Sequence, residues 1–185
     1  MKSFKSIGLM LVAALAFNAS FAQMEKTVEV GGAPMYPSKN IVENALNSKD
    51  HTTLVAAVKA AGLVETLMSA GPFTVFAPTN DAFGMLPAGT VEMLVKPENK
   101  AKLTGILTYH VVAGKLDADA LKDKIKMGNG TAELTTVAGG KLWIMKKDGK
   151  LWLKDENGGV AQITIKDVYQ SNGVIHVIDH VVLAK

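Results

Sequence analysis

The sequence predicts an α+β domain, because helix-like and strand-like patterns fall into separate halves of the chain. In residues 38–110 the apolar side chains recur mainly at the three- and four-residue spacing of amphipathic helices. From Thr131 onward, short β-branched and aromatic runs alternate with turn residues, as in antiparallel strands. One early run, residues 73–77, has the composition of a buried strand and is bounded by glycine and proline. We therefore expect this early strand to join the sheet of the second half.

The N-terminal segment has the parts of a secretory signal peptide. Lys2 and Lys5 precede an apolar run of 11 residues, and small side chains occupy the cleavage positions that end at Ala22. The run is shorter than the ~20 residues needed to cross a bilayer. We therefore predict that residues 1–22 are removed on export, to the periplasm or the exterior, and that the mature chain begins at Gln23.

The remainder of the chain is predicted to be one domain preceded by a short arm. Residues 23–37, punctuated by glycine and proline, are expected to form an N-terminal arm outside the core, and residues 38–185 the domain. With no cysteine, the exported domain must be stable without disulfides. All 20 basic residues are lysine, and removing two of them with the signal peptide lowers the formal charge from +3 to +1. Nucleic-acid-binding proteins usually carry clustered basic residues, so we exclude nucleic acid as a partner.

Helix-starting residues precede each helical pattern in the first half. The predicted helix starts are Ser38, Asp50, Thr79, Thr90 and Pro97. Gly62 is predicted to end the second helix, because glycine adopts the left-handed conformation that closes helices. Asp81 lies in the first turn after Thr79, where a carboxylate opposes the positive end of the helix dipole.

The second half contains five runs of predicted strand separated by turn residues. The runs cover residues 131–137, 142–146, 151–154, 160–168 and 174–183. Residues 147–149 (Lys-Asp-Gly) and 171–173 (Ser-Asn-Gly) have the composition of tight turns. The second half is therefore expected to form a largely antiparallel sheet.

Three ordered segments of the sequence resemble the fasciclin domain family. Residues 71–83 and 172–183 resemble its two signature motifs, and Tyr109-His110 followed by two valines resembles its central tyrosine-histidine pair. The resemblance covers residues 36–184 and extends to small single-domain bacterial members. It implies a fasciclin-like fold, in which a helical layer packs on a β-sandwich or wedge of mostly antiparallel strands. It also implies a role in adhesion or matrix interaction at the cell exterior.

The resemblance assigns structural roles to four residues of the signatures. Phe76 and Thr79 belong to the first signature, and His176 and Asp179 to the second. The integrin-binding role of tyrosine-histidine segments in animal members does not carry over to a bacterial chain, because only the segment is shared and not the partner.

The sequence gives no persuasive catalytic or metal-binding constellation. Ser171 lies in a turn and not in a Gly-x-Ser-x-Gly elbow, and the absence of cysteine excludes a thiol nucleophile. His176 and His180 are four residues apart on a predicted strand, which places them about 13 Å apart. That separation is too large for two ligands of one metal ion. We therefore expect no enzymatic activity, no metal and no cofactor.

Two polar pairs each have a structural and a functional interpretation. Tyr109 and His110 could form a recognition patch, or could join the end of a helix to the sheet through buried hydrogen bonds. Asn80 and Asp81 could contact a partner, or could serve only to start a helix. For both pairs the structural interpretation is the first choice.

Two tryptophans lie on the predicted arms of one hairpin. Trp143 and Trp152 could pack across the hairpin, or could form an exposed aromatic face for a glycan or a protein. We therefore take these tryptophans, with the two polar pairs, as candidate partner-binding residues.

The sequence as a whole favours an exported, non-enzymatic binding or adhesion module. Its expected partner is a protein or polysaccharide surface of the envelope or the exterior, bound by a monomer without a membrane span. The alternative is a carrier of a small apolar ligand in a pocket between the helices and the sheet.

Overall fold

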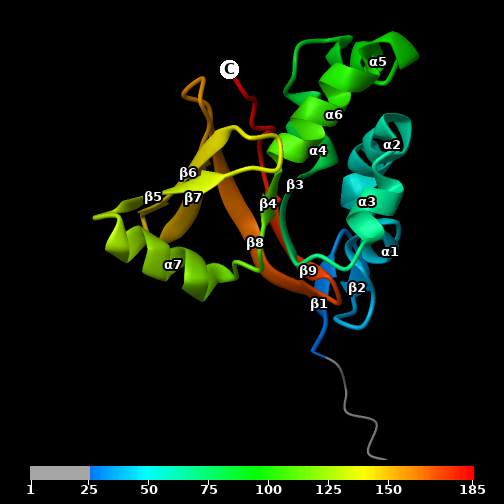
Figure 1. The fold of residues 1–185 in the computed structure, drawn as a ribbon. Coiled ribbons are helices and arrows are strands. Elements are labelled where there is room, and N and C mark those ends of the chain that lie inside the picture. Colours follow the sequence, from blue (N-terminus) through cyan, green and yellow to red (C-terminus); the bar gives the residue numbers. More distant parts are fainter. Residues whose placement is uncertain (1–25) are drawn as a thin grey trace, which may run out of the picture.

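The computed structural model describes residues 26–185, so the predicted signal peptide and its cleavage site lie outside the described residues. Helices of the first half pack against a curved sheet whose strands come mostly from the second half (Figure 1). All but one of the strand pairings within this sheet are antiparallel. The predicted α+β class and the helical layer on a mostly antiparallel sheet are therefore confirmed.

Helices and strands are numbered in chain order. The α-helices are α1 (Ile41–Ala45), α2 (Thr52–Ala61), α3 (Val64–Met68), α4 (Asn80–Gly84), α5 (Thr90–Leu94), α6 (Lys100–Tyr109) and α7 (Ala118–Met127). Short 3-10 helices, η1 (Lys49–His51) and η2 (Pro97–Asn99), lead into α2 and α6. The strands are β1 (Val28–Val30), β2 (Ala33–Met35), β3 (Phe73–Pro78), β4 (Val111–Ala113), β5 (Thr131–Thr135), β6 (Lys141–Lys147), β7 (Lys150–Lys154), β8 (Val160–Gln170) and β9 (Gly173–Ile178).

The main sheet has seven strands in the order β4-β3-β9-β8-β7-β6-β5. The early strand β3 joins it beside β9, in parallel, with Phe76 opposite His176. At the far ends of this order, Val112 of β4 forms a bridge with Thr136 just after β5. Val137 also donates its backbone N–H to the carbonyl of Val111, at 2.7 Å. The two edges of the sheet therefore meet, and the sheet curls around an interior.

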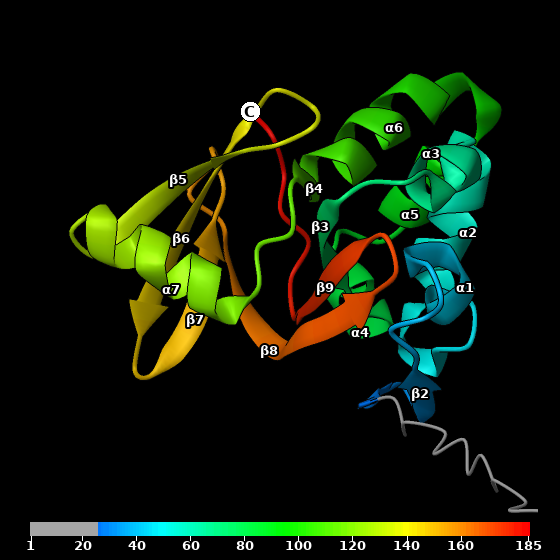
Figure 2. The ribbon, with the colours of Figure 1, turned by 60° about the horizontal axis from the view of Figure 1, so that its bottom comes forward.

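Alternate side chains of β3 and β9 face two separate hydrophobic cores. Val75 and Val177 face the helical side, where they pack with residues of α1, α2, α3 and α6. Phe76 and Ile178 face the curled interior, where they pack with strands β5–β8 and with the inner side of α7. Figure 2 shows α7 lying across β5–β7 on this side. The parallel pair β3–β9 is thus the wall shared by both cores.

Several helix predictions are confirmed and others are corrected at their ends. Thr79 caps α4 by accepting a hydrogen bond from the Ala82 N–H at 3.2 Å, and Gly62 ends α2 with φ 71°. The cap of α1 is Asn40 and not Ser38, because the Asn40 side chain and Glu43 form a reciprocal capping box.

Three further differences concern elements that the sequence patterns did not define correctly. The helix α7 was not predicted, and β9 ends at Ile178 although strand character was expected to residue 183. The arm 23–37 was expected to lie outside the core, yet it contains the β1–β2 hairpin, whose Val30 and Met35 are buried in the helical-side core. Each strand of this hairpin has only three residues, which is too short for an alternation of apolar and polar side chains to predict it from the sequence.

Candidate binding surfaces

Tyr109, at the end of α6, is fully buried in the curled interior. Its hydroxyl donates to the Lys141 carbonyl at 2.6 Å and accepts from the Glu156 N–H at 3.3 Å. Burial raises the pKa of this hydroxyl to about 12. Any side chain at Gly140 would place its Cβ 2.7 Å from the Tyr109 ring. Only glycine therefore allows the turn between β5 and β6 to pack directly against that ring. Tyr109 therefore fastens α6 to the strands of the second half.

His110 is also buried and has a backbone partner for each ring nitrogen. Nε2 accepts from the Val182 N–H at 3.2 Å, because a backbone N–H can only donate. The proton therefore resides on Nδ1, which donates to the Ile106 carbonyl at 2.8 Å. Burial lowers the pKa of this imidazole to about 4, so it is neutral at physiological pH. Since neither member of the pair offers surface to a partner, we place Tyr109 and His110 in the scaffold.

The second-signature histidine connects three segments of the fold. His176 accepts at Nδ1 from the Asp167 N–H, at 3.3 Å, and donates from Nε2 to the Leu116 carbonyl, at 2.8 Å. Burial lowers the pKa of this imidazole. Asp167 in turn accepts from the Ala118 N–H at 2.6 Å, at the start of α7. His176 thus fixes the irregular part of β8 and the entry to α7.

Asp179 directly follows β9 and links it to β8. Its Oδ1 accepts from the Gln162 N–H at 2.7 Å and pairs with Nδ1 of the exposed His180 at 2.8 Å. In residues 26–185, no group of three or more His, Asp or Glu side chains is arranged to hold a metal ion.

Asn80 joins the start of α4 to the start of α2. Its Oδ1 accepts from the Thr53 N–H at 3.0 Å, and its Nδ2 donates to the Lys49 carbonyl at 2.8 Å. The residue at the N-cap position of α2 makes no capping hydrogen bond through its side chain, so Asn80 supplies the cap from a distant part of the chain. Asp81, by contrast, is exposed in the first turn of α4.

Trp143 and Trp152 lie on the outer face of the sheet. Side chains along β6 and β7 point alternately to the two faces of the sheet. Leu142, Ile144 and Leu153 are buried in the curled interior, and both tryptophans are half-buried on the opposite face. In the described part of the chain, the helix that packs on these strands, α7, covers the inner side (Figure 2).

Polar side chains border these two tryptophans. Trp143 is opposite Glu133 and Lys154, while Trp152 is opposite Met145 and Gln162, so the two indoles are diagonal neighbours. We call this surface the outer face and define it by these residues: Glu133, Trp143, Met145, Trp152, Lys154 and Gln162.

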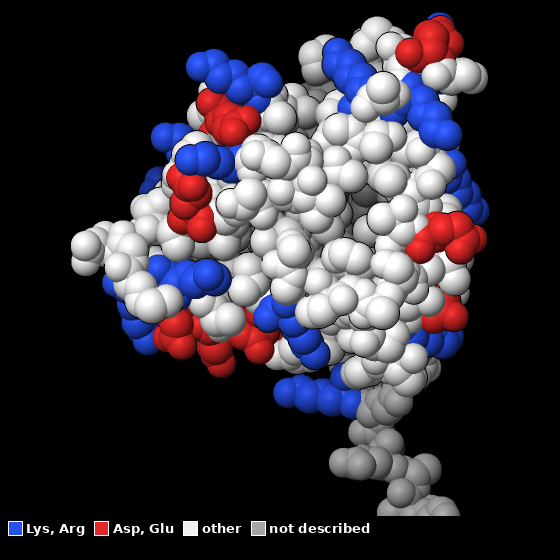
Figure 3. All heavy atoms as spheres, viewed as in Figure 1, with Lys and Arg blue, Asp and Glu red and all other residues white. Residues whose placement is uncertain are grey.

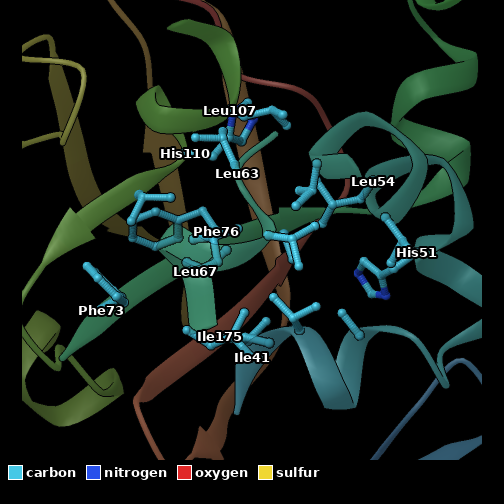
Figure 4. Close-up of a pocket in the computed structure, with 18 of the residues that line it drawn as sticks. Ile41, His51, Leu54, Leu63, Leu67, Phe73, Phe76, Leu107, His110 and Ile175 are labelled. Carbon is cyan, nitrogen blue, oxygen red and sulfur yellow. The ribbon is translucent and has the colours of Figure 1, made fainter. Parts of the chain in front are cut away.

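An apolar cavity of about 80 Å³ lies between the helices and the sheet (Figure 4). Its lining comes from α1, α2 and α3 on one side and from β3, β9 and the end of α6 on the other. His51 lines it, and its Nε2 is a buried ring nitrogen without a hydrogen-bond partner. The sequence analysis did not select His51, because a single histidine before a helix carries no signal of its own.

Sequence reasoning also missed the buried polar side chains that join distant segments. Asn172, taken as a turn residue at the start of the second signature, accepts from the Ile41 N–H at 3.1 Å and donates to the carbonyls of Leu67 and Ser69. Asp155 accepts from the Gly159 and Leu183 N–H groups. Except for Gly159, these partners lie far from the side chain in sequence, and no local pattern marks them.

The curled mixed sheet with a helical layer defines a fold that known proteins share. The sequence model of the fasciclin domain matches residues 49–184. Protein sll1483 of Synechocystis sp. is 49% identical over 165 residues, which cover 89% of this chain and 84% of that protein. Protein sll1735 of the same organism is 44% identical over 145 residues, covering 78% of this chain and 97% of that protein. The chain therefore belongs to the fasciclin domain family.

The fold also matches a solved structure of a FAS1 domain pair from the insect cell adhesion molecule Fasciclin I. The TM-score is 0.70 at 16% identity, over 86% of this chain and 58% of that one. This chain thus spans little more than half of the solved pair. The likeness shows a shared fold, as the ordered motifs predicted.

Proposed function

We propose that this protein is an exported, non-enzymatic adhesion module that binds a protein or polysaccharide surface through its outer face. The observation that carries the proposal is the pair of half-buried tryptophans, Trp143 and Trp152, which are diagonal neighbours on the sheet face opposite α7. Tryptophan is enriched at binding hot spots because it offers a large rigid apolar area together with a polar N–H.

The surroundings of the tryptophans suit recognition of a polar macromolecular surface. Glu133 and Lys141 form an exposed ion pair at 3.0 Å, and Lys150 donates to Gln162 at 3.3 Å. An apolar centre with a polar rim is the usual anatomy of a protein interface.

The remaining features favour binding over catalysis. His110 and His176 use both ring nitrogens in backbone hydrogen bonds, so neither is free to act as a general base. The match to a cell adhesion molecule, though it shares only the fold, agrees with a binding role.

Export is part of the proposal. It rests on the predicted signal peptide, residues 1–22, and places the module in the periplasm or outside the cell. Among the described residues, no helix is long and apolar enough to cross a membrane. Intact-mass measurement of the protein recovered from outside the cytoplasm tests the export step, and a mature chain beginning at Gln23 is the expected result.

Alanine substitution of the tryptophans tests the contact surface. Trp143→Ala and Trp152→Ala should each weaken attachment of protein-coated beads to the surface of the producing cells by at least about 10-fold, as for hot-spot residues. Tyr36→Ala is the matched control, because Tyr36 is an exposed aromatic residue away from these strands. Binding that is unchanged in both tryptophan variants would refute the outer face as the contact surface. Protease treatment of the target cells separates a protein partner, whose binding is lost, from a polysaccharide partner, whose binding persists.

A further inference from the structure

The cavity between the helices and the sheet has features of a ligand site that are independent of the outer face. We propose that it binds an unbranched alkyl molecule with one terminal hydroxyl group, and that Nε2 of His51 forms a hydrogen bond with that hydroxyl. The proposal goes beyond adhesion, because the cavity and the outer face share no residue.

The cavity has almost entirely apolar walls. Ile41, Leu54 and Val58 line the helical side, and Val75 and Ile175 line the sheet side. Figure 4 shows the imidazole of His51 at one end of the group of lining side chains, on the side of Leu54 and opposite Phe73. A ligand in this space would lie against hydrocarbon along most of its length and meet a ring nitrogen at one end.

His51 has an unused hydrogen-bonding group. The residue is only 3% exposed, and Nδ1 is 2.8 Å from the Ser48 hydroxyl. Nε2 is buried and has no hydrogen-bond partner within normal distance and angle. Burial lowers the pKa of the ring and outweighs the opposite effect of the nearby Ala77 backbone. Buried polar atoms almost always have a partner, so an unpaired one that lines an apolar cavity points to a missing group.

The chemistry of His51 favours a hydroxyl group over a charged one. Burial lowers the pKa of the imidazole, so the ring is neutral at physiological pH. The Ser48 hydroxyl can donate to Nδ1 or accept from it, which leaves Nε2 as a donor or as an acceptor. A ligand hydroxyl can complement either form, because it both donates and accepts.

The size of the cavity favours a slim alkyl chain. Its volume of about 80 Å³ is roughly half of the ~150 Å³ cavity that admits benzene in an engineered protein, so it would enclose the hydroxyl end and the first few carbons of the chain, with the rest lying in the opening. The exposed lining residues Lys59, Thr66 and Val137 mark where the cavity opens to solvent. Figure 3 shows the molecular surface hollowed between the parts formed by α6 and by α2–α3, with uncharged atoms around the hollow. A chain could therefore enter from this side and extend toward His51.

Titration of the full mature chain with 1-hexanol and with n-hexane tests the proposal. We expect 1-hexanol to bind about 3- to 10-fold more tightly than n-hexane, the gain of one buried hydrogen bond. The ¹⁵N chemical shift of His51 Nε2 should move with 1-hexanol and stay fixed with n-hexane. This measurement needs no substitution and therefore does not depend on the folding of a variant.

Substitution of His51 provides a second test of the proposal. His51→Phe, which replaces the imidazole with an aromatic ring that has no nitrogen, should bind the two probes equally. His180→Phe, at an exposed site, should keep the preference for 1-hexanol. Failure of the native protein to bind 1-hexanol, or equal binding of both probes with an unmoved Nε2 shift, would overturn the proposal. Loss of adhesion in the tryptophan variants is a separate readout, so either proposal can fail without the other.

Discussion

The ring of Phe76 stacks on the imidazole of His176, with centroids 5.7 Å apart and planes inclined by 25°. The two residues are register partners on the parallel strands β3 and β9, and both are fully buried. One belongs to the first signature segment and the other to the second. The two signature segments therefore meet inside the curled sheet, where these two buried rings pack against each other.

Truncation of Phe76 should be severely destabilising. Phe76→Ala removes a ring from a fully buried position and leaves a cavity beside His176, so we expect a loss of about 3–5 kcal/mol in the free energy of unfolding. Urea unfolding measures this loss. Met127→Ala, at a side chain that is 76% exposed, should change stability by less than about 0.5 kcal/mol. A similarly small loss for Phe76→Ala would show that the ring is not part of the core.

The position of β3 was predictable because its signals are local. Glycine and proline bound an apolar run that is buried on both sides, and Thr79 follows with a capping side chain. The helix α7 also carries local signals, the N-cap Asp117 and the inward-facing Leu121 and Ile125 four residues apart, but the sequence analysis did not use them. The polar junction at Asn172 had no such local signal, because its partners are set by the tertiary fold.

The candidate site was predictable only in part. The hairpin pattern placed Trp143 and Trp152 on adjacent strands, and strand alternation then puts them on one face. Their half-buried state depends on which face α7 covers, and that helix was not foreseen. The unpaired nitrogen of His51 depends on packing by three helices and two strands, which no sequence pattern encodes.

Substitutions of Tyr109 and His110 test whether this pair supports the fold or contacts a binding partner. Tyr109→Phe leaves the Lys141 carbonyl and the Glu156 N–H without their hydroxyl partner, and His110→Ala leaves the Val182 N–H unpaired. Each variant should lose roughly 1–3 kcal/mol of stability, as for stranded buried polar groups. Adhesion should decline only in proportion to the unfolded fraction. Unchanged melting temperatures with abolished adhesion would instead make the pair a direct contact.

Stability should fall as the pH is lowered from about 6.5 to about 4. Burial lowers the pKa of His110 from 6.5 to about 4, so in this range the unfolded chain binds a proton that the folded chain does not. The expected loss from His110 is on the order of 3 kcal/mol, complete near pH 4, and the lowered pKa values of His51 and His176 act in the same direction.

Urea unfolding at several pH values measures this dependence. His110→Gln should flatten the slope of stability against pH, whereas His180→Gln, at an exposed site, should leave it largely unchanged. A stability that stays constant between pH 7 and pH 4.5 would contradict the neutral, buried state of His110.

Asn172 should be the most sensitive polar residue of the helical side. Its side chain accepts from the Ile41 N–H at 3.1 Å and donates to the carbonyls of Leu67 and Ser69 at 2.8 and 2.9 Å, so one turn holds the start of α1 and the end of α3. Asn172→Ala leaves these three backbone groups unpaired, and we expect a loss of about 2–4 kcal/mol. Ser171→Ala, at the exposed neighbouring position, should be nearly neutral. Hydrogen exchange locates the effect: in Asn172→Ala the Ile41 amide should lose its protection first, while amides of β6 and β7 keep theirs. Equal loss of protection across the whole chain would indicate that α1 and α3 are not held to the sheet by this side chain alone.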